Sequence, residues 1–381
     1  MHAALYGPGG FYARGVPPAR HFRTSVHVSP SYAAAIWELL RQVDAGLGHP
    51  GRIDLVDIGA GRGELLEQVL AAAEQGSVAE PGGVSASAVL GADGALGASG
   101  ARGADGAPGT DRAPGASGAS GASVAPGLAG RIAARAVEVA PRPAGLDPRI
   151  SWHSVPPECI TGLVIASEWL DNVPLDVVEL TAAGPAVLQV DPATGAERPG
   201  CPPDPADLAW VRAWWPLVAR GDRAEVGRTR GEAWAGVIRR IDRGVAVAAD
   251  YGHVKAARPA WGTLTGYLEG RAVAPLPDGS RDITAHVALD ACAAAGQAAG
   301  ASKTVLTTQR AVLPGLGLNA RRPSLALATA DPERYARALG QASVNAELVD
   351  AQGLGGFGWL VQAVGTTLPV PLARLARCDP D

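Results

Sequence analysis

The 381-residue sequence has few of the residues that would indicate a metal site or structural disulfides. Its four cysteines, Cys159, Cys201, Cys292 and Cys378, lie far apart and form no Cys-x-x-Cys pair. This spacing matches no metal-ligand pattern and is typical of reduced thiols. We therefore expect no metal site and a cytoplasmic location.

Long apolar runs and an excess of positive charge are also lacking. No run of about 18 apolar residues is present, so we expect no membrane-spanning helix. The first 15 residues contain Gly and Pro where a signal peptide would have a continuous apolar segment. The net charge of −4 argues against a general nucleic-acid-binding protein, which would usually have a basic face.

Glycine and proline are abundant instead, with 50 and 31 residues. Much of the glycine lies in residues 76–130, where large apolar side chains are almost absent. From Gly91 to Gly121 glycine occupies every third position except at Arg112, but proline is too rare there for a collagen triple helix. We expect a disordered insertion in a surface loop, because the segment has too little apolar surface to offset the entropy lost on ordering.

The remaining sequence alternates strand-like and helix-like segments. Short apolar runs predict buried strands at residues 53–58, 136–139, 150–153, 162–167, 245–250, 303–309 and 359–364. Helices are predicted at residues 30–46, 64–74, 229–243 and 283–295. This alternation indicates an α/β fold with an about seven-stranded, mostly parallel sheet.

The chain is expected to form one large domain with additions. Residues 1–50 would be an N-terminal helical segment on the substrate side, and residues 51–381 would form the α/β domain. Two inserted caps are expected over one edge of the sheet, at about residues 177–243 and 253–281. The three tryptophans at positions 210, 214 and 215 follow helical spacing, which favours a role in the core of the first cap.

A glycine turn follows the first predicted strand, in the run Asp57-Ile58-Gly59-Ala60-Gly61-Arg62-Gly63. Glycine lets the backbone approach a ligand closely, although an ordinary tight turn is the alternative. The run is neither a dinucleotide fingerprint, since Glu64 takes the place of the last glycine, nor a phosphate loop. An acid before such a turn suits a ligand with a cationic amino-acid end, and S-adenosylmethionine fits. Asp57 would face its amine, and Gly59, Gly61 and Gly63 would pack against it.

Glu138 is the second residue predicted to bind this cofactor. It closes the second strand, where an acid accepts hydrogen bonds from ribose hydroxyls in folds of this kind. Such an acid usually lies about 20 residues beyond the first motif. Here the glycine-rich insertion places Glu138 81 positions after Asp57.

Several separated blocks of the sequence resemble the MidA-like family of class I methyltransferases, whose members include the mitochondrial complex I assembly arginine methyltransferase. The blocks are Phe22–Ser29, Ser167–Pro174, Asp250-Tyr251-Gly252, Gly262-Thr263-Leu264 and Asp282–Val287. Two positions depart from the family pattern, because His27 replaces a glutamate and Ser167 replaces an asparagine. The resemblance implies a Rossmann-like class I methyltransferase fold, S-adenosyl-L-methionine as the cofactor, and a protein side chain as the acceptor.

The block after the fourth strand contains the candidate catalytic residues, Glu168 and Asp171. Two carboxylates three residues apart can bind a guanidinium in bidentate fashion and localise a nitrogen lone pair, which favours arginine as the acceptor. A helix-capping acid and a solvated neighbour are the alternative interpretation. Candidate substrate-side residues are Thr24, Ser25, Asp250, Tyr251 and His286. We expect His286 to lie in the first turn of a helix that Asp282 caps.

Two other functions remain open from the sequence. One is a small-molecule O- or N-methyltransferase, and the other is an S-adenosylmethionine-binding assembly factor without catalytic activity, which the substitutions at His27 and Ser167 would allow. The expected partner is a protein or small-molecule methyl acceptor, with no nucleic acid and no membrane. Whether the chain forms a homo-oligomer stays open.

Overall fold

The computed structural model describes residues 1–12, 24–78 and 127–375. The predicted disordered insertion therefore lies largely outside the described residues, as do Phe22 and Cys378. No helix of the described part is long and apolar enough to cross a membrane.

A seven-stranded sheet forms the centre of the molecule, in the order β15-β16-β9-β4-β1-β2-β3. Its strands are β1 (Ile53–Ile58), β2 (Ile132–Val137), β3 (Ser151–His153), β4 (Ile160–Ser167), β9 (Ile241–Asp250), β15 (Lys303–Thr308) and β16 (Gly358–Val364). Neighbouring strands pair in parallel from β3 to β9, whereas β16 is antiparallel to both of its neighbours. The predicted fold class is confirmed, including all seven predicted strands.

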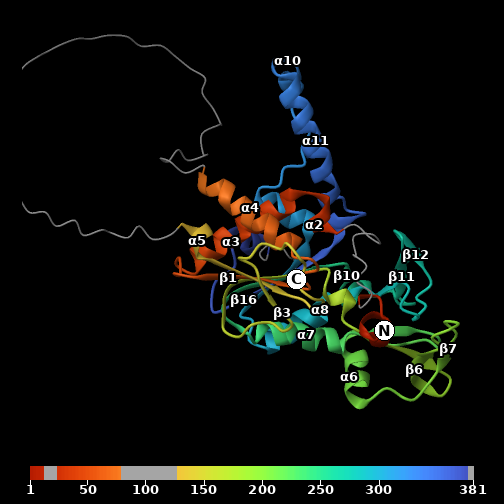
Figure 1. The fold of residues 1–381 in the computed structure, drawn as a ribbon. Coiled ribbons are helices and arrows are strands. Elements are labelled where there is room, and N and C mark those ends of the chain that lie inside the picture. Colours follow the sequence, from red (N-terminus) through yellow and green to blue (C-terminus); the bar gives the residue numbers. More distant parts are fainter. Residues whose placement is uncertain (13–23, 79–126, 376–381) are drawn as a thin grey trace, which may run out of the picture.

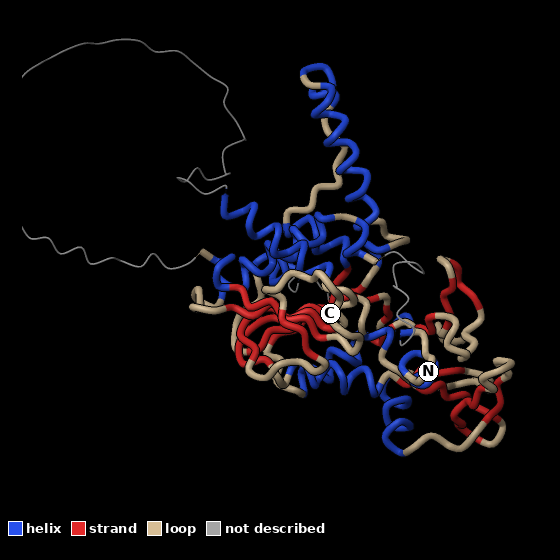
Figure 2. Tube along the Cα trace, viewed as in Figure 1, coloured by secondary structure: helices blue, strands red, loops and turns tan. Residues whose placement is uncertain are grey.

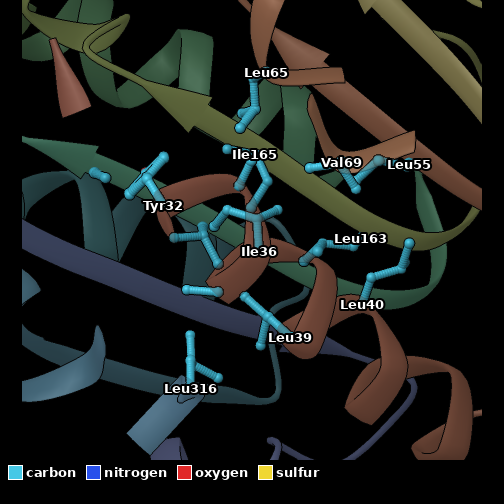
Figure 3. Packing of buried hydrophobic residues seen from close by; sticks show 14 of the residues in the cluster. Tyr32, Ile36, Leu39, Leu40, Leu55, Leu65, Val69, Leu163, Ile165 and Leu316 are labelled. Carbon is cyan, nitrogen blue, oxygen red and sulfur yellow. The ribbon is translucent and has the colours of Figure 1, made fainter. Parts of the chain in front are cut away.

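Helices cover both faces of this sheet (Figures 1 and 2). On one face lie α3 (Pro30–Gly46), α4 (Glu64–Val78) and the short α5 (Leu128–Arg131), and on the other lie α7 (Arg228–Ile238) and α8 (Leu289–Ala298). Ile36, Leu39 and Leu40 of α3 pack on Leu55 and Leu163 of the sheet in the larger core (Figure 3). Helix α3 is thus part of the main core rather than a separate N-terminal segment.

Two small sheets lie beside the carboxyl edge of the main sheet. The first contains β5 (Asp176–Thr181), β6 (Gly184–Val190), β7 (Glu197–Pro199) and β8 (Arg223–Val226), with α6 (Pro205–Trp214) packed on it. The second contains β11 (Thr265–Leu268), β12 (Arg271–Val273) and β13 (Asp282–Thr284). Of the three tryptophans predicted for the core of the first cap, Trp210 and Trp215 are buried there, and Trp214 is only partly buried against it.

Two boundaries differ from the sequence predictions. The first cap ends at β8, because Trp234, Val237 and Ile238 of α7 are buried against the main sheet. The helix expected over residues 283–295 begins only at Leu289. The preceding residues form β13 and β14 (Val287–Ala288), since their backbones pair with β11 and with β10 (Gly252–His253), and this pairing outweighs the local helix propensity.

Short helices and an arm complete the described chain. They are α1 (His2–Tyr6), α2 (Ser25–Val28), α9 (Gln309–Val312) and α12 (Val370–Leu375), together with the 3₁₀ turns η3 (Leu170–Asn172), η4 (Lys255–Ala257), η5 (Leu313–Leu316) and η6 (Leu354–Gly356). Helices α10 (Leu325–Ala330) and α11 (Pro332–Val349) project together from the helical layer (Figure 1). The sequence interpretation missed this arm.

Candidate active site

The glycine turn joins β1 to α4 at the carboxyl edge of the sheet. Gly59, Gly61 and Gly63 have φ angles of +72°, +57° and +87°, a left-handed region that favours glycine. A Cβ atom at Gly59 would lie 2.8 Å from Cδ1 of Trp169, and one at Gly63 would lie 2.7 Å from Cδ1 of Leu146. The turn therefore needs glycine for its backbone conformation and, at two positions, for close packing.

Glu138 lies directly over this turn. The amide of Gly61 donates a hydrogen bond to Oε2 of Glu138 at 3.1 Å, and the amide of Val139 donates to Oε1 at 2.6 Å. The two acids of the motif come together because β1 and β2 are parallel, with Ile58 opposite Val137. A carboxylate at this place can accept hydrogen bonds from the hydroxyls of a ribose.

Asp57 lies beneath the turn, and only 4% of its surface is exposed. Its carboxyl group makes no hydrogen bond among the described residues. Burial, with smaller contributions from Glu138 and Glu64, raises the pKa of Asp57 to about 8. A buried carboxyl group without a partner fits a cationic ligand group. Together with the glycine turn and Glu138, it fits the amino-acid end and the ribose of S-adenosylmethionine.

A cluster of four acids lies at the ends of β4 and β9. The cluster consists of Glu168, Asp171, Asp250 and Asp282. Glu168, the first residue after β4, is half-buried and has a φ of +53°. Its Oε1 accepts a hydrogen bond from the amide of Ser25 at 3.2 Å. Burial, and then the charge of Asp171, raises the pKa of Glu168 to about 8.

Asp171 occupies a different environment from Glu168. It is almost completely buried, and its oxygens accept hydrogen bonds from the Tyr251 hydroxyl, the Thr284 hydroxyl at 2.8 Å and Nδ2 of Asn172 at 3.0 Å. Burial raises the pKa of Asp171, and these donors act against that shift. The two carboxylates therefore do not form the shared surface that the three-residue spacing predicted. Glu168 is half-buried and accepts from a main-chain amide, while Asp171 is buried and bonds to other side chains.

Arg230 is the basic residue in contact with this cluster. Its guanidinium is buried and donates to the main-chain oxygens of Asp171, Val173, Ala285 and His286. These bonds join η3 to the segment between β13 and β14. Its donors are engaged by carbonyl groups, so the acid cluster keeps an excess of potential negative charge.

The predicted substrate-side residues are divided between the surface and the interior. Ser25 contacts Glu168, whereas the hydroxyl of Thr24 lies 2.6 Å from Nδ1 of His27. Asp250 is completely buried, so it lies behind the site and not on its surface as expected. The rings of Tyr251 and His286 are 5.4 Å apart.

The expected helical position of His286 is wrong, because it lies between β13 and β14. Its amide donates to the hydroxyl of Thr263 at 2.8 Å. The carboxylate of Glu225 in turn accepts from the Thr263 hydroxyl at 2.7 Å. The Gly262-Thr263-Leu264 block thus fastens the second cap to β8 and to the segment of His286.

Sequence reasoning missed three residues that contact the candidate site. Trp169 covers the glycine turn, and the hydroxyls of Tyr6 and Tyr12 contact Asn172 next to Asp171. The distribution of aromatic residues in the sequence could have indicated a role for the two tyrosines. The chain has six Tyr and three Phe, and three of these nine residues lie within the first 12 positions.

Comparisons with known proteins agree with this geometry. Residues 127–307 match the model of a family described as "Putative S-adenosyl-L-methionine-dependent methyltransferase". In these residues the chain is similar to that family, which corresponds to the MidA-like methyltransferases. The match supports the predicted cofactor, S-adenosylmethionine. The glycine turn precedes the matched range.

Two crystal structures from Burkholderia thailandensis share the fold. One shows a COG1565 superfamily member bound to S-adenosyl-homocysteine, with 22% identity, a TM-score of 0.68, and coverage of 98% of this chain and 88% of that chain. The other is a native structure of a COG1565 superfamily protein, with the same identity and coverage and a TM-score of 0.69. Comparison with curated proteins gives no match. The structural likeness extends over the glycine turn and both caps.

Proposed function

We propose that this protein is an S-adenosylmethionine-dependent methyltransferase that modifies a protein side chain, with an arginine guanidinium as its favoured acceptor. The observation that carries the proposal is the half-buried carboxyl of Glu168 in front of three buried acids. A cationic acceptor is attracted to such a cluster, because the guanidinium of Arg230, which contacts it, donates to main-chain oxygens.

Cofactor binding is assigned to the glycine turn and its two acids. Asp57 would pair with the ammonium group, and Glu138 would accept hydrogen bonds from the ribose. The turn is open at Gly61, where the nearest neighbour of an added Cβ atom would be Oε2 of Glu64, 3.8 Å away. This leaves room for the ligand beside the turn. When bound, S-adenosylmethionine supplies a methyl group on a positively charged sulfur.

Glu168 is assigned the acceptor side of the reaction. In its ionised form it would accept hydrogen bonds from a guanidinium and localise a lone pair on the nitrogen that attacks the methyl carbon. As the new C–N bond forms, the C–S bond breaks and its electron pair goes to sulfur. The surplus proton leaves the acceptor nitrogen, and a carboxylate with a pKa of about 8 is suited to receive it near neutral pH. Asp171 would act through Tyr251 and Thr284, which it holds.

Calorimetric titration with S-adenosylmethionine and with NAD tests the cofactor assignment. We expect binding of the first and none of the second, and the reverse result would overturn the assignment.

A labelling experiment tests the acceptor assignment. When the purified protein and tritiated S-adenosylmethionine are added to a lysate, protein in the lysate should become labelled. Glu168→Gln should abolish that labelling and leave cofactor affinity unchanged, whereas Glu158→Gln, an exposed control, should change neither the labelling nor the affinity. Label only in small molecules would favour a small-molecule acceptor, and cofactor binding without any label would favour an assembly factor.

A further inference from the structure

The backbone of Glu168 has a conformation that its own side chain disfavours. Its φ is +53°, a left-handed value that non-glycine residues adopt only when their surroundings impose it. Its amide donates to the main-chain oxygen of Ala249 in β9 at 2.8 Å, which fixes one side of the residue. The main-chain carbonyl group of Glu168 needs a further contact, because the chain leaves β4 at this point and enters η3.

Asn172 supplies that contact from the end of the same turn. Its side-chain amide donates from Nδ2 to the main-chain oxygen of Glu168 at 3.2 Å and to Oδ1 of Asp171 at 3.0 Å. Both partners are acceptors, so the NH₂ end of the Asn172 amide must face them. The Oδ1 end then points the other way and needs a donor.

The first 12 residues provide that donor from far away in the sequence. The hydroxyl of Tyr12 donates to Oδ1 of Asn172 at 2.8 Å, and the hydroxyl of Tyr6 donates to the main-chain oxygen of Asn172 at 3.1 Å. The two rings are stacked, with centroids 5.4 Å apart. Leu5 and Phe11 anchor this segment in a small core with Ile283 of β13. Tyr6 and Tyr12 thus hold Asn172 in one place and one orientation.

We propose that Tyr12, Tyr6 and Asn172 are positioning residues that hold Glu168 in its left-handed conformation and so aim its carboxyl group at the acceptor. This inference rests on the proposed role of Glu168 in methyl transfer. Neither tyrosine makes a hydrogen bond to Glu168. The Tyr12 hydroxyl acts through the side-chain amide of Asn172 and also lies 3.3 Å from Oδ1 of Asp282, whereas the Tyr6 hydroxyl acts through the main-chain oxygen of Asn172.

Hydrogen exchange measured by mass spectrometry tests the conformational part directly. The amides of Glu168, Asp171, Asn172 and Val173 all have acceptors, so this segment should exchange slowly in the wild-type protein. Tyr12→Phe removes a single hydroxyl and should speed exchange in this segment without changing α4 or the main sheet. Tyr335→Phe, on the projecting arm, is the matched control and should leave exchange unchanged in all of these regions. Unchanged exchange of residues 168–173 in Tyr12→Phe would overturn the proposal.

Kinetics test whether the tyrosine acts through Asn172. Loss of one such hydrogen bond should lower the rate of protein labelling by about tenfold, with calorimetric affinity for S-adenosylmethionine within about twofold of wild type. If Tyr12 works through Asn172, the double variant Tyr12→Phe/Asn172→Ala should be no slower than Asn172→Ala alone. Fully multiplicative effects would contradict the proposal. A wild-type protein that binds cofactor but labels nothing would instead refute the proposed function, and the exchange experiment would still decide the positioning role.

Discussion

The carboxylate of Glu138 accepts a hydrogen bond from the amide of Gly61 at 3.1 Å, although 77 positions separate the two residues. The parallel pairing of β1 with β2 explains this contact, because it brings the carboxyl ends of both strands to the same edge of the sheet. Helix α4, which precedes the insertion, also contacts α5, which follows it. The candidate cofactor site is therefore assembled by strand pairing, and the length of chain between the strands has little influence on it.

Glu138→Gln should weaken binding of S-adenosylmethionine. A glutamine keeps the size of the side chain but loses the charge that strengthens hydrogen bonds from two ribose hydroxyls, so we expect a loss of affinity of about tenfold to a hundredfold. Titration calorimetry would measure it. The exposed Glu158 offers a control, because Glu158→Gln should leave affinity unchanged. If the Glu138 variant bound S-adenosylmethionine as tightly as the wild-type protein, Glu138 would not be part of the cofactor site.

Deleting residues 80–125 and joining the ends by a short Gly/Ser linker should leave cofactor affinity nearly unchanged. Helix α4 before the insertion and helix α5 after it contact each other, which favours a short linker. The loop-closure entropy changes only slowly with length, by about 0.6 kcal/mol for each doubling. Calorimetry and thermal unfolding would measure the effect. A drop in affinity or in thermal midpoint comparable with that of Glu138→Gln would show that the insertion contributes to the fold or site.

The fold, and the meeting of Glu138 with the glycine turn in the candidate cofactor site, could be predicted from the sequence because both depend on local patterns. A buried strand, three glycines and an acid lie within 11 residues, and β2 ends in its own acid. Parallel pairing then brings Glu138 to the turn without further information. The burial of Trp210 in the core of the first cap could be predicted as well, because it lies within α6, whereas the buried Trp215 follows the end of that helix.

The acceptor half of the site could not be predicted in this way. The spacing of Glu168 and Asp171 suggested that both carboxylates bind one guanidinium, yet Glu168 has a left-handed backbone and is half-buried, whereas Asp171 lies in a 3₁₀ turn and is buried. Asp171 is enclosed by Tyr251 and Thr284, which are distant in the sequence. The expected helix around His286 failed for the same reason, since pairing with distant strands decided the conformation there.

Affinity for S-adenosylmethionine should rise with pH between about pH 6 and 7.5. In the free protein the pKa of Asp57 is about 8, so this carboxyl is mostly protonated in that range and must lose its proton to pair with an ammonium group. The ligand amine, with an ordinary pKa near 8, stays largely protonated there. The neighbouring Glu64 has a lowered pKa and is ionised throughout. Calorimetry in buffers of different ionisation enthalpy should reveal proton release on binding.

Asp57→Asn provides the control for this pH dependence. The amide cannot ionise, so the variant should bind more weakly and release no proton. The pH dependence of folding stability provides a second check, because stability should fall with rising pH whereas cofactor affinity should rise. Because the folded pKa of Asp57 lies above its unfolded value, the folded state binds more protons between about pH 4 and 8, and Asp57 makes stability fall as pH rises through that range. Asp57→Asn should flatten this fall. An equally steep pH dependence in the variant would assign it to other groups.

Glu168→Gly should be more stable than Glu168→Ala. Both variants lose the carboxyl group and its hydrogen bond from Ser25, so they differ chiefly in how well each residue tolerates a φ of +53°. Glycine adopts this conformation without steric cost, whereas alanine does not, and we expect a difference of about 1 kcal/mol in the free energy of unfolding. Urea denaturation would measure it. At Glu158, which is not among the residues with positive φ, the same pair should show alanine as stable as glycine or more so. If alanine were the more stable residue at position 168 as well, the left-handed conformation would not be a feature of the folded protein in solution, and the positioning role of Asn172 and Tyr12 would lose its basis.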